Sequence, residues 1–246
     1  MKIWKIILIC ISVTLTAGYL IFALVFIPKT DTMICTGINV EILDADSKQF
    51  VSDKEIKQLI DSRYPHIIEK KFADIDFAKI EKIAKEHTMV KMAACYKLQN
   101  GNLKIDITQR QPIFRVISGT RNYYIDIEGN EMPTSINHSV YVPIVTGNVN
   151  SKFIKDKLFD FIVFLQNDKF LRSQIEQIHV CPNMEIELVP RVGQHIIYLG
   201  QIDGYEEKLE RLLIFYEKGL SQTGWNQYTG ISLKYKDQVV CTKKKQ

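Results

Sequence analysis

The chain lacks the short motifs that most enzyme and metal sites require. It has no CxxC pair, no HExxH and no GxSxG, and its 12 glycines are scattered instead of forming a phosphate-binding loop. None of the five histidines pairs with another histidine or a glutamate at metal-ligand spacing, and cysteines and histidines form no cluster in the sequence. The sequence therefore predicts no metal, no cofactor and no small-molecule substrate.

A strong charge of either sign is also missing. The net charge is +4, and the only charge run is Lys243–Lys245 near the end of the chain. No basic stripe alternates with aromatic side chains, so a nucleic-acid partner is not expected. With 46% hydrophobic and 24% charged residues, the 246 residues suit one large or two small globular domains.

One long uncharged run is present, Ile6–Ile27. Its roughly 22 residues would rise about 33 Å as a helix, enough to cross a bilayer and longer than the apolar region of a cleaved signal peptide. Lys2 and Lys5 precede it, which favours a cytoplasmic N-terminus. We expect a cytoplasmic tail (residues 1–5), a single retained anchor in the cytoplasmic (inner) membrane (residues 6–27), and the rest of the chain outside the cytoplasm.

Four cysteines would lie in that external part: Cys35, Cys95, Cys181 and Cys241. Disulfides are permitted outside the cytoplasm, but their pairing does not follow from the spacing. Free thiols packed as small hydrophobic side chains are an equally good interpretation. The disulfide state stays open.

Residues 36–110 predict a small α+β domain with the order strand–helix–helix–strand–strand. Ser52 and Glu55 form a capping-box pattern before the first helix, and a second helix begins near Asp74 or Asp76. Asn100-Gly101 is a hairpin signal between strands at 89–99 and 103–108. Two helices on one face of a three-stranded sheet satisfy this pattern.

Residues 111–246 predict a second, β-rich domain with two long helices. One helix is expected to begin at Ser151 as its N-cap, and the other to run from Tyr205 to about Leu220. Expected strands include 113–117, 122–127, 140–147, 175–180, 184–189 and 195–200, and a last strand through 230–241 that ends or bends near Asp237.

The two units meet at Arg110-Gln111-Pro112 without a flexible spacer. Pro112 lacks a backbone donor and restricts Gln111 to extended geometry, so we expect a stiff junction that Arg110 ties by hydrogen bonds. Asp126 and Glu128 lie nearby at alternating positions. They suit a solvated strand face better than an acid–base pair, although an anchored envelope enzyme remains an alternative.

Several segments together resemble the FtsQ/DivIB family of bacterial cell-division proteins. They are "LKIDITQRQPIFRV", "YYIDIEGNEM", "VPIVTG" and "GYEEKLERLLIFYEKG" followed by "GISLKYKD". The likeness extends from the anchor to about Cys241. Gln109 stands where the family usually has Glu, Val142 stands where Leu is commoner, and the tail "QVVCTKKKQ" is less similar to the family.

The resemblance implies a POTRA-type first domain and a non-enzymatic scaffold of the divisome at the septum. It also implies that the C-terminal strand binds bitopic FtsB/FtsL-like proteins. Here the matching strand is 231–239, with Tyr235 as aromatic anchor and Lys234 beside it. The implied partner-binding residues are Ile231, Ser232, Leu233, Lys234, Tyr235, Lys236, Asp237 and Val239. The alternatives are a strand that only completes the sheet, and a POTRA-bearing envelope transport or assembly component.

Overall fold

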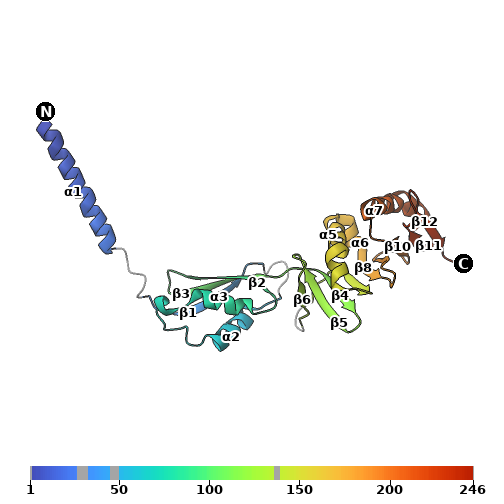
Figure 1. Cartoon of the computed structure of the whole chain (residues 1–246), viewed down its shortest axis with the longest axis horizontal. Helices are drawn as coiled ribbons and strands as arrows, with labels where there is room; N and C mark the ends of the chain where they lie inside the picture. Colours follow the sequence, from blue (N-terminus) through green and yellow to red (C-terminus); the bar gives the residue numbers. More distant parts are fainter. Residues whose placement is uncertain (1, 27–32, 45–49, 136–138, 246) are drawn as a thin grey trace.

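The computed structural model describes residues 2–26, 33–44, 50–135 and 139–245, which form two domains after an N-terminal helix (Figure 1). Helix α1 comprises Lys2–Phe26. Ile27, the last residue of the predicted membrane anchor, lies outside the described residues, as do Met1 and Gln246. Over the part of the chain that can be searched, no helix is both long enough and apolar enough to span a membrane.

The first domain has the predicted α+β order. The predicted capping box forms, since the Ser52 side chain accepts from the Glu55 amide, and Asp76 caps the second helix. Gly101 takes the positive φ of 82° that the hairpin turn requires. The elements are β1 (Gly37–Ile42), α2 (Asp53–Arg63), the 3₁₀ turn η2 (Phe72–Asp74), α3 (Phe77–Lys85), β2 (Val90–Lys97) and β3 (Asn102–Gln109).

The strand order in this domain is β1-β3-β2, with β3 in the middle. Strand β1 is parallel to β3, and β2 is antiparallel to it. Alternate residues of β3 are buried, and Ile80 and Ile83 of α3 pack in the same hydrophobic core. The two helices therefore supply the apolar cover that a three-stranded sheet needs.

The second domain contains a nine-stranded sheet in the order β12-β11-β10-β9-β8-β7-β4-β5-β6. Its strands are β4 (Pro112–Ser118), β5 (Arg121–Asp126), β6 (Glu131–Pro133), β7 (Ile144–Gly147), β8 (Ile175–Val180), β9 (Ile186–Pro190), β10 (Ile196–Gly200), β11 (Tyr228–Ser232) and β12 (Val240–Lys243). Its helical segments are α4 (Ser151–Phe153), η3 (Ile154–Leu158), α5 (Phe159–Asn167), α6 (Lys169–Gln174), α7 (Tyr205–Ile214), η4 (Phe215–Leu220) and α8 (Ser221–Thr223). The α+β class predicted from the sequence is confirmed.

Three predicted boundaries in this domain are wrong. Asn150, not Ser151, caps the first helix, because its side chain accepts from the Phe153 amide at 2.8 Å. The strand expected over 140–147 begins only at Ile144, after Pro143. The last strand is split: β11 ends at Ser232, and a separate strand, β12, returns antiparallel to it.

The two ends of the nine-stranded sheet have different surroundings. At the β6 end, Met132 is fully buried and, together with Tyr124, belongs to the hydrophobic core of the first domain. At the other end, no described strand pairs with the outer side of β12. Figure 1 shows the first domain beside β6 and the C-terminus beside β12.

Candidate functional site

The open edge of the sheet is a short hairpin made by β11 and β12. Strand β11 lies between β10, to which it is parallel, and β12, to which it is antiparallel. Strand β12 has four residues, of which Val240 is 42% exposed. An edge strand carries backbone donors and acceptors that a further strand can pair with.

Two contacts from outside the strand explain why β11 stops at Ser232. The Arg211 guanidinium, from α7, donates to the carbonyl oxygens of Leu233 and Tyr235 at 3.4 and 3.5 Å. Asp237 then takes a left-handed φ of 58°, which reverses the chain direction. The predicted continuous strand 231–239 is therefore wrong, since its second half is the loop before β12.

The residues predicted to bind a partner lie in three different environments. Ile231 and Leu233 are fully buried in the second-domain core, and Ser232 ends β11. Tyr235 is 53% exposed. The remaining residues continue through the loop, where Lys234, Lys236 and Asp237 are exposed and Val239 is half-buried.

An ion pair fixes the first part of this loop. The Lys234 ammonium binds the carboxylate of Glu185, which lies in the turn between β8 and β9. The hydrogen bond raises the pKa of Lys234 and lowers the pKa of Glu185. The aliphatic side chain of Lys234 also lies over Gly200, where an added Cβ would come within 2.9 Å of the Lys234 Cγ. These contacts leave Tyr235 as the exposed aromatic residue of the loop.

A depression of 380 Å³ lies next to the loop, between it and the last long helix. Ile214, Phe215 and the aliphatic part of Lys218 form one wall, and Asp237 and Val239 form the other. Ile214 is 48% exposed there. An apolar recess therefore lies beside the loop that leads into β12.

The helix that lines this recess is locally π-helical. Segment η4, Phe215–Leu220, replaces the α-helical turn after Ile214. Gly219 allows the Phe215 ring to fold over the wider turn, because an added Cβ would lie 2.7 Å from that ring. π-Helical segments are frequent at functional sites, where they redirect side chains.

Arg110 links the two domains. Its Nε and Nη2 atoms lie 2.8 and 2.7 Å from the same carboxylate oxygen of Asp126. Nη2 also donates to the Glu131 carbonyl oxygen of β6 at 2.9 Å, and the Arg110 amide donates to the Met89 carbonyl oxygen. Asp126 is only 2% exposed, and its second oxygen accepts the Glu128 and Asn130 amides.

Pro112 begins β4 directly after this junction. Gln109, where the family usually has Glu, ends β3 with a buried side chain whose oxygen accepts the amides of Phe50 and Val51 at 2.6 and 3.0 Å. A carbonyl oxygen satisfies these two donors without a buried charge. The Glu128 carboxylate binds Lys91 of β2 at 2.7 Å, which is a second bridge between the domains.

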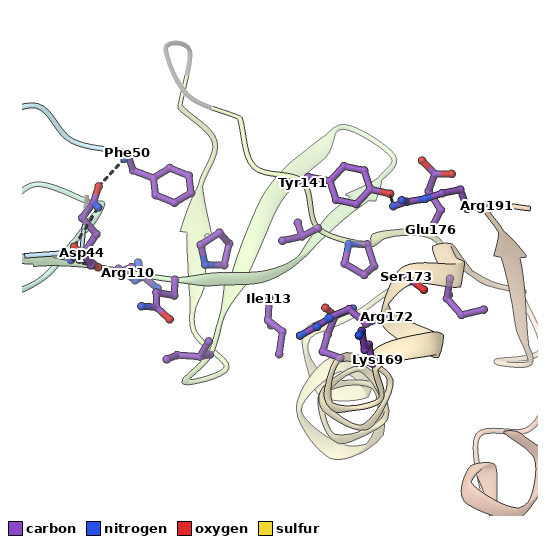
Figure 2. A pocket seen from close by; sticks show the side chains of 18 residues that line it. Asp44, Phe50, Arg110, Ile113, Tyr141, Lys169, Arg172, Ser173, Glu176 and Arg191 are labelled. Atoms are coloured by element: carbon purple, nitrogen blue, oxygen red, sulfur yellow. Dashed lines mark hydrogen bonds between the residues drawn. The ribbon is translucent and has the colours of Figure 1, made fainter. Parts of the chain in front are cut away.

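A cavity of 720 Å³ lies where the domains meet. Figure 2 shows Tyr141 beside the Arg191 guanidinium, with Lys169 and Arg172 of α6 on another wall and Glu176 nearby. The Arg191 guanidinium carbon is 4.9 Å from the centre of the Tyr141 ring. Neither Asp126 nor Glu128 lines this cavity. The two carboxylates thus serve the junction and do not form an acid–base pair at this cavity.

The structure also brings together a potential metal-ligand group that the sequence analysis missed. Ligand atoms of His179, Cys181 and Glu187 lie within 4.8 Å of one another, and all three residues are half-buried. No spacing rule reveals this group, because Glu187 arrives from the neighbouring strand opposite His179. The expectation that histidine and cysteine do not cluster is therefore wrong.

The four cysteines whose disulfide state the sequence left open, Cys35, Cys95, Cys181 and Cys241, are free thiols in the structure. Cys35 and Cys95 are buried in the first domain, and burial, with help from Glu81, raises the pKa of Cys95 to about 12. Cys181 and Cys241 are half-buried in the second domain, where burial raises the pKa of each.

Two family models match the chain, one for each domain. The model described as "FtsQ/DivIB, C-terminal related" matches residues 111–242, which is more than half of the chain. The chain belongs to the FtsQ/DivIB family. A POTRA-like domain model matches residues 33–108, as the resemblance predicted for the first domain. Members of the FtsQ/DivIB family are non-catalytic division proteins, so membership indicates a role in cell division. No curated protein matches the chain.

Proposed function

We propose that this FtsQ/DivIB protein is a non-catalytic divisome scaffold that binds an FtsB/FtsL-like complex along β12 at the septum. The observation that carries the proposal is the open outer side of β12, which follows a loop that lines an apolar recess. A strand from the partner would add to this edge as a tenth strand, and its side chains would select the site.

The energetics of strand addition require an anchor besides the backbone. Each backbone hydrogen bond contributes only about 0.5–1.5 kcal/mol net, and β12 has four residues to offer. Ordering the partner strand offsets much of this gain. The recess beside Ile214 and the exposed ring of Tyr235 supply apolar surface of the kind that dominates interface energies.

We also propose that the Ile6–Ile27 run anchors the chain in the cytoplasmic membrane, with the two domains on the outside. The support is the uncharged run itself and the two lysines before it. A partner confined to the same membrane plane meets the edge at a high effective concentration, so a modest interface suffices.

A scaffold role agrees with the ion pairs at the domain junction, in which both carboxylates are bound by basic side chains. Asp126 is held by Arg110, and Glu128 is held by Lys91. Their contacts fix the angle between the domains, which sets the direction of the β12 edge relative to the first domain.

The test compares two truncations of the full chain in pulldowns from membranes. A chain that ends at Val239 lacks β12, whereas a control that ends at Lys244 keeps it. We expect the first to lose the FtsB/FtsL-like partner and the second to retain it, with both showing the same urea transition for the first domain. Capture of the partner by a folded chain without β12 would contradict the proposal.

The cellular role has its own readout. Depletion should give filamentous cells with unfinished septa, and a fluorescent fusion should gather at midcell. A uniform membrane signal with normal division would remove the divisome assignment, whatever the pulldown shows.

A further inference from the structure

The solvent-facing side of the nine-stranded sheet carries a row of polar side chains. Strand register places Thr146 of β7 opposite His179 of β8, and His179 opposite Glu187 of β9. Directly paired residues project from the same face of a sheet. The intervening residues Ile178 and Leu188 are fully buried in the core, so the row lies on the face away from it.

Cys181 completes a group of three ligand types on this face. Its sulfur, a His179 ring nitrogen and a Glu187 carboxylate oxygen lie within 4.8 Å of one another. In tetrahedral zinc sites, bonds of about 2.0–2.3 Å put ligand atoms about 3.3–3.7 Å apart. Small side-chain rotations therefore close the group around one ion.

A hydrogen-bonded chain orients the histidine. The Gln177 amide donates to the Thr146 hydroxyl oxygen at 3.1 Å, and that oxygen lies 3.0 Å from His179 Nδ1. With Nδ1 engaged, Nε2 is the nitrogen available for a metal bond. Metal-binding histidines typically have their second ring nitrogen fixed in this way by a neighbouring polar group.

We propose that His179, Cys181 and Glu187 bind one zinc-class divalent ion. Thiolate, imidazole and carboxylate together suit Zn²⁺, whereas Mg²⁺ and Ca²⁺ prefer oxygen ligands alone. Three protein ligands leave a fourth position for water. This proposal rests on the geometry of the second domain and does not depend on partner binding.

The ion would close the turn between β8 and β9. That turn holds Met184 at a left-handed φ of 64°, and the Cys181 amide donates to the Glu185 carbonyl oxygen at 2.9 Å. Glu185 also binds Lys234 of the C-terminal loop. An ion bound by both Cys181 and Glu187 would therefore make the turn between β8 and β9 more rigid, and this turn holds the C-terminal loop through Glu185.

The test uses the full chain, stripped with a chelator and titrated with Co²⁺ as a spectroscopic substitute for Zn²⁺. We expect one equivalent to bind with a thiolate-to-cobalt charge-transfer band that Zn²⁺ abolishes. Saturating Zn²⁺ at about 100 times its Kd should raise the Tm of the second domain by roughly 5–10 °C.

Variants assign the ligands. Cys181→Ser should lose the charge-transfer band, Glu187→Gln should weaken binding, and Thr146→Val should lower affinity about 10- to 100-fold by freeing the histidine ring. The exposed His66, replaced as His66→Asn, is the matched control and should change nothing. A band that persists in Cys181→Ser, or Co²⁺ binding without any band, would overturn the proposal.

Discussion

The two edges of the nine-stranded sheet differ in how far the chain itself covers them. At β6, the first domain buries Met132, and Arg110 occupies the Glu131 carbonyl oxygen. At β12, the structure shows an exposed Val240 and no further strand among the described residues. An edge that is not protected within its own chain is available to another chain. The covered end thus sets domain geometry, and the open end is where we place the partner.

The largest expected effect is at the covered end. Arg110→Ala would leave the buried Asp126 carboxylate without its cation, which costs about 3–5 kcal/mol for a buried pair. The control is Arg121→Ala, whose pair with Glu131 is about half-exposed and should therefore contribute little to stability. Urea unfolding of both variants measures the difference. Equal losses would mean that Arg110 does not hold the junction.

A core substitution compares the two ends directly. Met132→Ala should lower the free energy of unfolding by about 2–5 kcal/mol, because Met132 is fully buried between the domains. Val240→Ala, at the open end, should change it by less than about 0.5 kcal/mol. If thermal unfolding gave Val240→Ala the larger loss, the open end would already be buried by something in the free protein.

Substitutions near the open end should change the affinity for the partner and leave the stability of the protein nearly unchanged. Tyr235→Ala should weaken capture of the FtsB/FtsL-like partner about tenfold, since exposed aromatic anchors often contribute about 1–2 kcal/mol or more. Ile68→Ala is a matched control in the first domain, because Ile68 is also 53% exposed. Titration of the purified partner into each variant gives the affinities. Unchanged affinity for Tyr235→Ala would exclude Tyr235 as the aromatic anchor.

The smallest expected effect is the response of the second domain to acid. Burial lowers the pKa of His195, whose Nε2 lies 2.8 Å from the Tyr216 hydroxyl of η4. The unfolded chain then binds a proton at His195 more readily than the folded chain. Its stability contribution is therefore present above about pH 6.5 and is lost as the pH falls below that value.

The fluorescence of Trp225, whose ring centre is 5.0 Å from that of Tyr216, can follow the thermal unfolding of the second domain at each pH. The Tm of the second domain should fall between about pH 7.5 and pH 5, and His195→Gln should flatten the slope. His66→Asn, at an exposed position of the first domain, should keep the full slope. A slope that survives in His195→Gln would assign the acid sensitivity to another group.

Local chemistry made most of the first domain predictable. The Ser52–Glu55 capping box, the Asp76 cap and the Asn100-Gly101 turn each depend on residues within a few positions of one another, and each forms where the sequence indicates. The position of the domain junction is predictable for the same reason, since Pro112 restricts the backbone of the residue before it.

The C-terminal edge was harder because its determinants are distant in sequence. The alternation of "SLKYKDQVVC" continues through the loop, and only Arg211, from α7, shows that the carbonyl groups of Leu233 and Tyr235 are taken. The group at His179 was missed for a similar reason, because strand register, not spacing, places Glu187 beside it.

The most direct test of the open-end account is photo-crosslinking in dividing cells. A photoreactive residue at Thr242, on the exposed β12, should crosslink to the FtsB-like partner, while the same residue at Pro133, on β6, should not. Crosslinks at Thr242 alone are the predicted result. Crosslinks to that partner at Pro133 but none at Thr242 would place the partner at the covered end and contradict the account.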